Sequence, residues 1–85
     1  MKFIILFEAN NEIDRSKIMT EFKKDFDPLT ENKTIQNYIC FGNKPDAIAI
    51  VFMKSMSDLD YYTRRFRAFS KVTVIPAESY KDFPL

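Results

Sequence analysis

Few side chains in this sequence are suited to catalysis or metal binding. Cys40 is the only cysteine, and there is no histidine. A thiol nucleophile needs a nearby base, so Cys40 is expected to be an inert, small hydrophobic residue in a strand. Only scattered carboxylates remain as metal ligands, so we predict no metal site and no cofactor. Gly42 is the only glycine, which excludes a glycine-rich phosphate-binding loop.

Four basic residues lie close together in the second half of the chain, at Arg64, Arg65, Arg67 and Lys71. Such a cluster could contact nucleic-acid phosphates. Alternatively, these cations lie on the solvated C-terminal part of a helix, where the helix dipole favours positive charge. The formal net charge is only +1. We therefore favour the second interpretation and keep weak nucleic-acid binding as an alternative function.

Length and composition predict a single domain spanning residues 1–85. The chain is 46% hydrophobic, with nine Phe and four Tyr, which is enough apolar mass for a core. A single cysteine excludes an intrachain disulfide and favours a reducing compartment. The apolar run before Glu8 has only five residues, too few for a signal peptide or a membrane span. We therefore predict a cytoplasmic protein with no membrane segment.

The first half of the chain predicts a strand and then a helix. Residues 2–9 are rich in β-branched and aromatic side chains and read as a strand that is apolar on both faces. Residues 14–26 follow as a helix, with either Asp14 or Asn11 as its N-cap. Pro28 is expected to end this helix. The spacing of four apolar residues defines its buried face: Ile18, Met19, Phe22 and Phe26.

The second half predicts a β-hairpin, a helix and a last strand. Residues 34–42 and 46–53 form two strands joined by the short turn "NKPD", so they pair antiparallel. A helix begins at Ser57, with Asp60 completing a capping box and Met56 and Tyr61 spaced as a hydrophobic staple. Residues 71–78 form the last strand. The buried stripe of the second helix comprises Leu59, Tyr62, Phe66 and Phe69.

The predicted element order, βαββαβ, is typical of an α+β, ferredoxin-like plait. In this fold a four-stranded antiparallel sheet carries both helices on one face. The stretch "DAIAIVFM" is apolar on both sides of its strand, so the second face of the sheet needs a cover. A second copy of the sheet would supply one and give a homodimer. Alternatively, Tyr80 and Phe83 of the tail fold across this face. The predicted dimer face comprises Phe3, Ile5, Phe7, Ile48, Ile50 and Phe52.

The sequence resembles the dimeric α/β-barrel superfamily and, more narrowly, the family called domain of unknown function 3303. The resemblance rests on "MKFIILF", on Arg15, on the hairpin "NYICFGNKPDAIAIVFMKS" and on "FRAFSKVTVIP". Family members resemble the last run with an aromatic residue ten positions before a proline, here Phe66 and Pro76. This chain departs from the family in lacking Trp and His, which excludes any histidine-based role. The resemblance implies the fold and dimerisation, but no known activity.

The resemblance also implies a pocket between the sheet and the helices. Tyr38, Cys40, Tyr62 and Phe66 would line it, and Arg15 would be a charged group at its mouth, which suits a small apolar ligand. The alternative is a core filled by Phe and Met side chains. We therefore expect a self-associating domain that binds a small ligand or a protein partner without catalysis. The alternative is a cofactor-independent enzyme of oxygenase or isomerase type.

Overall fold

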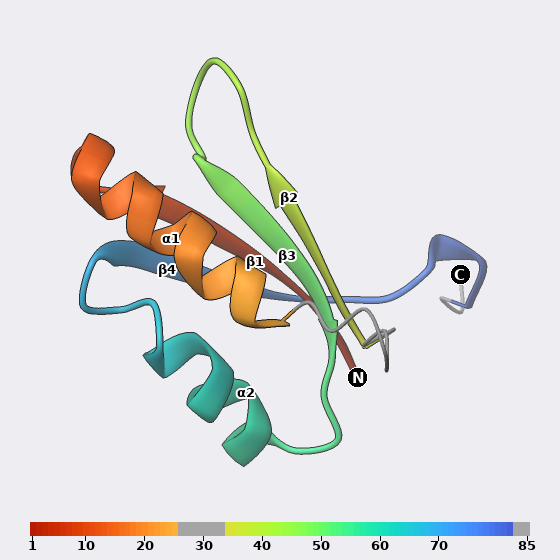
Figure 1. The fold of residues 1–85 in the computed structure, drawn as a ribbon. Coiled ribbons are helices and arrows are strands. Elements are labelled where there is room, and N and C mark those ends of the chain that lie inside the picture. The colour runs from red at the N-terminus through yellow and green to blue at the C-terminus, as the bar shows by residue number, and fades with distance from the viewer. Residues whose placement is uncertain (26–33, 83–85) are drawn as a thin grey trace.

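Strand β1 (Lys2–Ala9) lies at the centre of the sheet, beside β3 (Ala47–Phe52), in the computed structural model of the protein (Figure 1). The edge strands are β2 (Ile35–Ile39), beside β3, and β4 (Ser70–Ala77), beside β1. All three pairings are antiparallel. The two strands predicted to be apolar on both faces are therefore the central ones.

Two helices cover one face of this sheet, α1 (Glu12–Asp25) and α2 (Met56–Arg64) (Figure 1). The element order βαββαβ confirms the predicted α+β ferredoxin-like plait. The structure describes residues 1–25 and 34–82, and within these ranges no helix is both long and apolar enough to cross a membrane. The predicted roles of Phe26, Pro28 and Phe83 lie outside the described residues.

The covered face of the sheet pairs large side chains on β1 with small ones on β3. Phe7 lies opposite Ala47, and Ile5 lies opposite Ala49. The small β3 residues leave room above them for aromatic rings from the helices. The ring of Phe7 lies 4.5 Å from that of Phe66 and 5.4 Å from that of Phe22, measured between centroids. These contacts join α1 and the turns that follow α2 to the central strand.

The first helix begins at Glu12, earlier than its predicted start at residue 14. Its N-cap is Asn11, the alternative cap, whose Oδ1 accepts a hydrogen bond from the Asp14 amide at 2.9 Å. Asp14 therefore lies inside the first turn, where its carboxylate is favourable to the helix dipole. Ile18 and Phe22 are buried as predicted, but Met19 is exposed.

The second helix also begins earlier than predicted. Ser55 is its N-cap, and its side-chain oxygen accepts a hydrogen bond from the Asp58 amide at 3.1 Å. The prediction of Ser57 as the cap was wrong, because Ser57 already lies in the helix. Met56 and Tyr61 are both exposed, so they do not form the predicted staple. With Ser55 as the cap, the staple positions are Lys54 and Leu59.

The buried stripe of the second helix is confirmed. Leu59, Tyr62 and Phe66 are buried, and Phe69 packs against the core. Phe66 lies beyond the helix end, in the turns that lead to β4. The four residues of the stripe are spaced by three, four and three positions, and this helical spacing was sufficient to identify the inward side chains. The helix itself ends earlier, at Arg64.

The predicted dimer face combined residues from opposite faces of the sheet and is corrected by the strand register. On one face Lys2 of β1 lies opposite Phe52 of β3, Ile4 opposite Ile50, and Leu6 opposite Ile48. Directly opposed residues project from the same face, and successive residues alternate. Phe3, Ile5 and Phe7 are therefore buried beneath the helices. The apolar β1 residues that share a face with the remaining predicted members, Ile48, Ile50 and Phe52, are Ile4 and Leu6.

The described part of the tail does not cover that second face. After β4 the chain passes the ends of β3 and β2 in this view and reaches a short 3₁₀ helix, η1 (Tyr80–Asp82), that lies beyond the sheet (Figure 1). The side chain of Tyr80 is 78% exposed. The alternative in which Tyr80 packs across the sheet is therefore wrong for this residue.

The two serines at the start of α2 provide a matched test of the cap. We expect Ser55→Ala to lower the free energy of unfolding by about 1 kcal/mol, because an N-cap oxygen satisfies a helix amide. Ser57→Ala should change it by less than about 0.5 kcal/mol, since this exposed side chain makes no hydrogen bond in the described structure. Urea unfolding would measure both values. Equal effects, or a larger effect of Ser57→Ala, would contradict the assignment.

Candidate functional site

The face of the sheet opposite the helices is the candidate interaction surface, and we call it the open face. Its apolar part is built from residues of β1, β3 and β4. Polar side chains lie mainly on the edge strands, as Gln36 and Tyr38 on β2 and Thr73 on β4. The apolar residues of the open face are Ile4, Leu6, Ile48, Ile50, Phe52 and Ile75.

Several apolar side chains of the open face remain in contact with solvent. Phe52 is 48% exposed and Ile75 is 41% exposed. The four isoleucine and leucine side chains nearer the middle of the face are half-buried: Ile4, Leu6, Ile48 and Ile50. A four-stranded sheet about 18 Å long has a face of about 350 Å² in plan, so its apolar part is no larger than the largest apolar patch of a typical monomer, and such patches are often functional.

Charged side chains mark the two ends of β1 on the open face. At one end, the Lys2 Nζ lies 5.2 Å from the centroid of the Phe52 ring. At the other end, the Glu8 Oε2 lies 3.9 Å from the Lys71 Nζ, and these side chains are 40% and 75% exposed. The apolar centre is thus bounded by a cation at one end and by a loose, solvated ion pair at the other.

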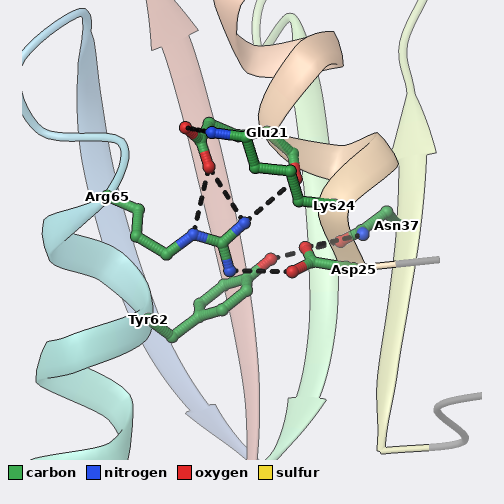
Figure 2. A network of polar contacts seen from close by, with 6 residues as sticks. All are labelled: Glu21, Lys24, Asp25, Asn37, Tyr62 and Arg65. Atoms are coloured by element: carbon green, nitrogen blue, oxygen red, sulfur yellow. Dashed lines mark hydrogen bonds and ion pairs between the residues drawn. The ribbon is translucent and has the colours of Figure 1, made fainter. Parts of the chain in front are cut away.

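On the covered side, Arg65 links the two helices (Figure 2). Its Nε and Nη2 donate hydrogen bonds to the Glu21 Oε2 at 3.1 and 3.0 Å, and its Nη1 donates to the Asp25 Oδ1 at 2.7 Å. The guanidinium also lies 5.5 Å from the centroid of the Tyr62 ring. Arg65 therefore combines a forked carboxylate contact with aromatic stacking.

The same network extends to the edge strand β2. The Asn37 Nδ2 donates to the Asp25 Oδ2 at 3.2 Å, and the Tyr62 hydroxyl donates to the Asn37 Oδ1 at 3.2 Å (Figure 2). Burial raises the pKa of Tyr62 well above its ordinary value of 10.0, and the nearby Asp25 carboxylate raises it further against the opposing effect of Arg65. Tyr62 thus remains a neutral hydrogen-bond donor at physiological pH, which suits a structural role and not that of a general base.

The residues predicted to line a ligand pocket do not come together. Tyr38 lies on the open face, where its hydroxyl contacts the Gln36 Oε1 at 3.4 Å. Tyr62 and Phe66 lie on the opposite side of the sheet and are buried in the core. The prediction placed both tyrosines in one pocket between sheet and helices, and the alternation of β2 excludes that arrangement. Tyr62 and Phe66 instead fill the core, as in the alternative interpretation.

Arg15 and Cys40, the other two predicted pocket residues, meet at the base of the β2–β3 hairpin. The Arg15 Nη2 donates to the Cys40 carbonyl oxygen at 3.3 Å, and its Nε lies 3.8 Å from the Asp46 Oδ1. Asp46 also accepts a hydrogen bond from the Ala9 amide at 2.7 Å and one from the Lys44 ammonium. These contacts attach the hairpin to the end of β1 and the start of α1, so Arg15 acts as a structural anchor here.

Three acidic residues in these networks were not predicted from the sequence. Glu21 and Asp25 lie outside the predicted buried face of the first helix, yet both bind Arg65, which is 40 or more positions away along the chain. Asp46 precedes an apolar strand, and its charge next to "AIAIVF" was the only local signal of a special position. Their contacts depend on the tertiary fold and not on any local pattern.

The predicted basic cluster is largely paired with acidic groups. Arg64 forms an ion pair with Asp60 on α2, and Lys71 lies near Glu8. Arg65 is held by the network described above, and the Arg67 Nη2 donates to the Thr63 hydroxyl at 3.3 Å. Within residues 1–25 and 34–82, no cluster of three His, Cys, Asp or Glu side chains has a geometry that could hold a metal ion.

Comparisons of the chain with protein-family models, with curated protein sequences and with solved structures found no match. The resemblance to dimeric α/β-barrel proteins therefore stays a prediction.

The neighbouring residues Arg64 and Arg65 provide a matched test of the interhelical network. We expect Arg65→Gln to lower the free energy of unfolding by about 2 kcal/mol, because it leaves the mostly buried Asp25 carboxylate without its cation. Arg64→Gln removes an exposed pair and should cost less than about 0.5 kcal/mol. Urea unfolding would measure both. Similar losses for the two variants would show that Arg65 contributes no more than a surface ion pair.

Asp46 should make the stability of the fold depend on pH. The hydrogen bond from Lys44, opposed by burial and aided by the Ala9 amide, lowers the pKa of Asp46 below its ordinary value of 3.8. The charged form therefore stabilises the folded state above about pH 4, and this contribution is lost as the pH falls through the folded pKa. We expect Asp46→Asn to be about 1 kcal/mol less stable than the wild type at pH 7. This difference should become smaller at about pH 3, because protonation then removes part of the stabilisation that the carboxylate provides.

Urea titrations of both proteins at the two pH values would measure this change. Glu78→Gln serves as the control, because Glu78 makes no ion pair within the described structure. A stability difference for Asp46→Asn that stays constant between the two pH values would contradict the assigned role of the carboxylate.

Proposed function

We propose that this protein is a non-catalytic, self-associating domain that forms a homodimer through its open face, and that it acts in the cytoplasm. The observation that carries the proposal is the apolar part of the open face, where Phe52 in an outer row and Ile75 on the edge strand β4 keep 48% and 41% of their surface exposed. Neither helix nor the described part of the tail covers these residues. Burying them against a protein partner would recover hydrophobic free energy that the isolated chain leaves unused.

A second copy is the partner that fits this surface best. Two identical sheet faces can pack about 10 Å apart with interdigitated side chains, and a two-fold axis makes the surface complementary to itself. Two faces of about 350 Å² in plan sum to about 700 Å², which is below the roughly 1,000 Å² of a stable specific interface and is the size of a weak, transient one. We therefore expect a dimer that dissociates on dilution within the micromolar range.

The polar networks favour a binding role over a catalytic one. The hydroxyl of Tyr62 donates to Asn37, and the side chains of Arg15 and Arg65 bind carboxylates of the same chain. These groups are occupied in holding the fold together. The residues considered for a ligand pocket also lie on two sides of the sheet, so the proposal is limited to a protein partner.

Solution mass measured by light scattering across a dilution series tests the proposal. We expect the wild type to have twice the chain mass at about 500 µM and to approach the chain mass near about 1 µM. Ile75→Lys should shift the midpoint of this transition at least about tenfold towards higher concentration, because it places an unpaired charge in the interface. Ile75 is already partly exposed, so the variant should still fold.

Ile13→Lys is the matched control, since Ile13 is an exposed isoleucine on α1, on the helical side of the sheet. It should dimerise like the wild type. A wild-type protein that stays monomeric at about 500 µM would overturn the proposal. So would an Ile75→Lys variant that dimerises as well as the Ile13→Lys control.

A further inference from the structure

We propose that the two copies pack with their β1 strands antiparallel across the interface, so that Lys2 of each copy faces Glu8 of the other. This inference depends on the proposed function, because it specifies the geometry of the same open face. It rests on the strand register, on the positions of the charges and on the partners that these charges have in the described structure.

The register arranges the open face in four cross-strand rows. The two middle rows are mainly apolar: one contains Ile50, Ile4 and Ile75, and the other contains Ile48, Leu6 and Thr73. The two outer rows carry the charges. One contains Phe52, Lys2 and Ala77, and the other contains Glu8 and Lys71.

Two symmetric ways of stacking the sheets treat these rows differently. A two-fold axis parallel to the strands places each row over the same row of the second copy, so Lys2 lies close to Lys2 and Glu8 close to Glu8. A two-fold axis across the strands exchanges the ends, so Lys2 lies over Glu8 of the second copy. Opposite charges attract and like charges in an interface are costly, so the second arrangement is electrostatically favoured.

The apolar rows also fit the arrangement with the axis across the strands. Centred between the two middle rows, this axis places Ile4 over Leu6 of the second copy and Ile50 over Ile48. The apolar centre of one face then lies over the apolar centre of the other. Long side chains such as lysine and glutamate can together span the spacing of about 10 Å between packed sheets.

The two charged groups are available for such a contact. Within the described structure, Lys2 has no carboxylate within ion-pair distance, and its ammonium rests above the Phe52 ring. Glu8 has only the long 3.9 Å contact with the highly exposed Lys71. Exposed pairs of this kind are weak, so Glu8 can turn to a second cation at little cost.

A charge-swap series measured by light scattering tests the inference. Lys2→Glu turns two attractive contacts of the dimer into repulsive ones, so its dissociation constant should rise about tenfold. Glu8→Lys should weaken the dimer similarly. The double variant Lys2→Glu/Glu8→Lys should return to within about threefold of the wild type, because the attraction is restored with the charges exchanged.

Lys23→Glu on α1 is the control for a general change of net charge, and it should leave the dissociation constant unchanged. Lys23 is exposed and lies on the helical side of the sheet. At about 1 M salt the effect of Lys2→Glu should largely disappear, since exposed charges are then screened.

Zero-length carbodiimide cross-linking gives a second, direct readout. Lys2 and Glu8 of one chain are six residues apart on an extended strand, about 20 Å, so they cannot be joined within a chain. A Lys2–Glu8 cross-link between isotope-labelled and unlabelled copies, detected by mass spectrometry, would support the geometry. The Glu8–Lys71 cross-link within one chain serves as the internal positive control.

The outcomes separate this inference from the proposed function. A monomeric wild type would overturn both. A wild-type dimer that is disrupted by Ile75→Lys, but whose Lys2→Glu weakening is not rescued in the double variant, would overturn only the antiparallel geometry. Mixed-isotope cross-links from Lys2 to residues other than Glu8, with none to Glu8, would overturn it in the same way.

Discussion

The pairing register of β1 with β3 is the constraint on which the rest of the structure depends. It places Phe7 opposite Ala47 on one face and Leu6 opposite Ile48 on the other. A shift of one residue would exchange the faces, burying Lys2 and Glu8 beneath the helices and exposing the four β1 residues that belong to the core, Phe3, Ile5, Phe7 and Ala9. The aromatic core and the apolar open face are therefore two consequences of one register.

Polar networks hold the other elements against this central pair. Arg65 binds carboxylates on α1 while its guanidinium lies over aromatic rings of the α2 segment, so it joins the two helices. Asp46 does the same for the β2–β3 hairpin, the end of β1 and the start of α1. Both networks consist of paired charges, and in the described residues no buried side-chain nitrogen or oxygen lacks a hydrogen-bond partner. The buried polar groups on the covered side thus have hydrogen-bond partners within the chain. The surface that still lacks a partner is the apolar part of the open face, where Phe52 and Ile75 are exposed.

Prediction from the sequence was accurate for the order and type of the elements and less so for their starts. Period-two and period-3.6 patterns are local, so β1 and the inward stripe of α2 could be read directly. Cap choice was harder, because Ser55 and Ser57 are both suitable N-cap residues with an acidic residue three positions on. The backbone at Ser55 is extended and places its oxygen at the Asp58 amide, a geometry that residue type alone does not specify.

By itself, the sequence determined that two strands are apolar on both sides and that the fold is a βαββαβ plait, because side-chain alternation and helical spacing are set by the local backbone. Only the tertiary structure decided which of the two alternating sets of β1 side chains faces the helices. That choice depends on the register between β1 and β3, whose paired residues are about 45 positions apart. The same is true of the tyrosines: residue type predicted Tyr38 and Tyr62 in one pocket, and the orientation of β2 places them on opposite sides of the sheet. Contacts between distant residues, such as Arg65 with Asp25, depend on how the elements pack, and no local pattern encodes that packing.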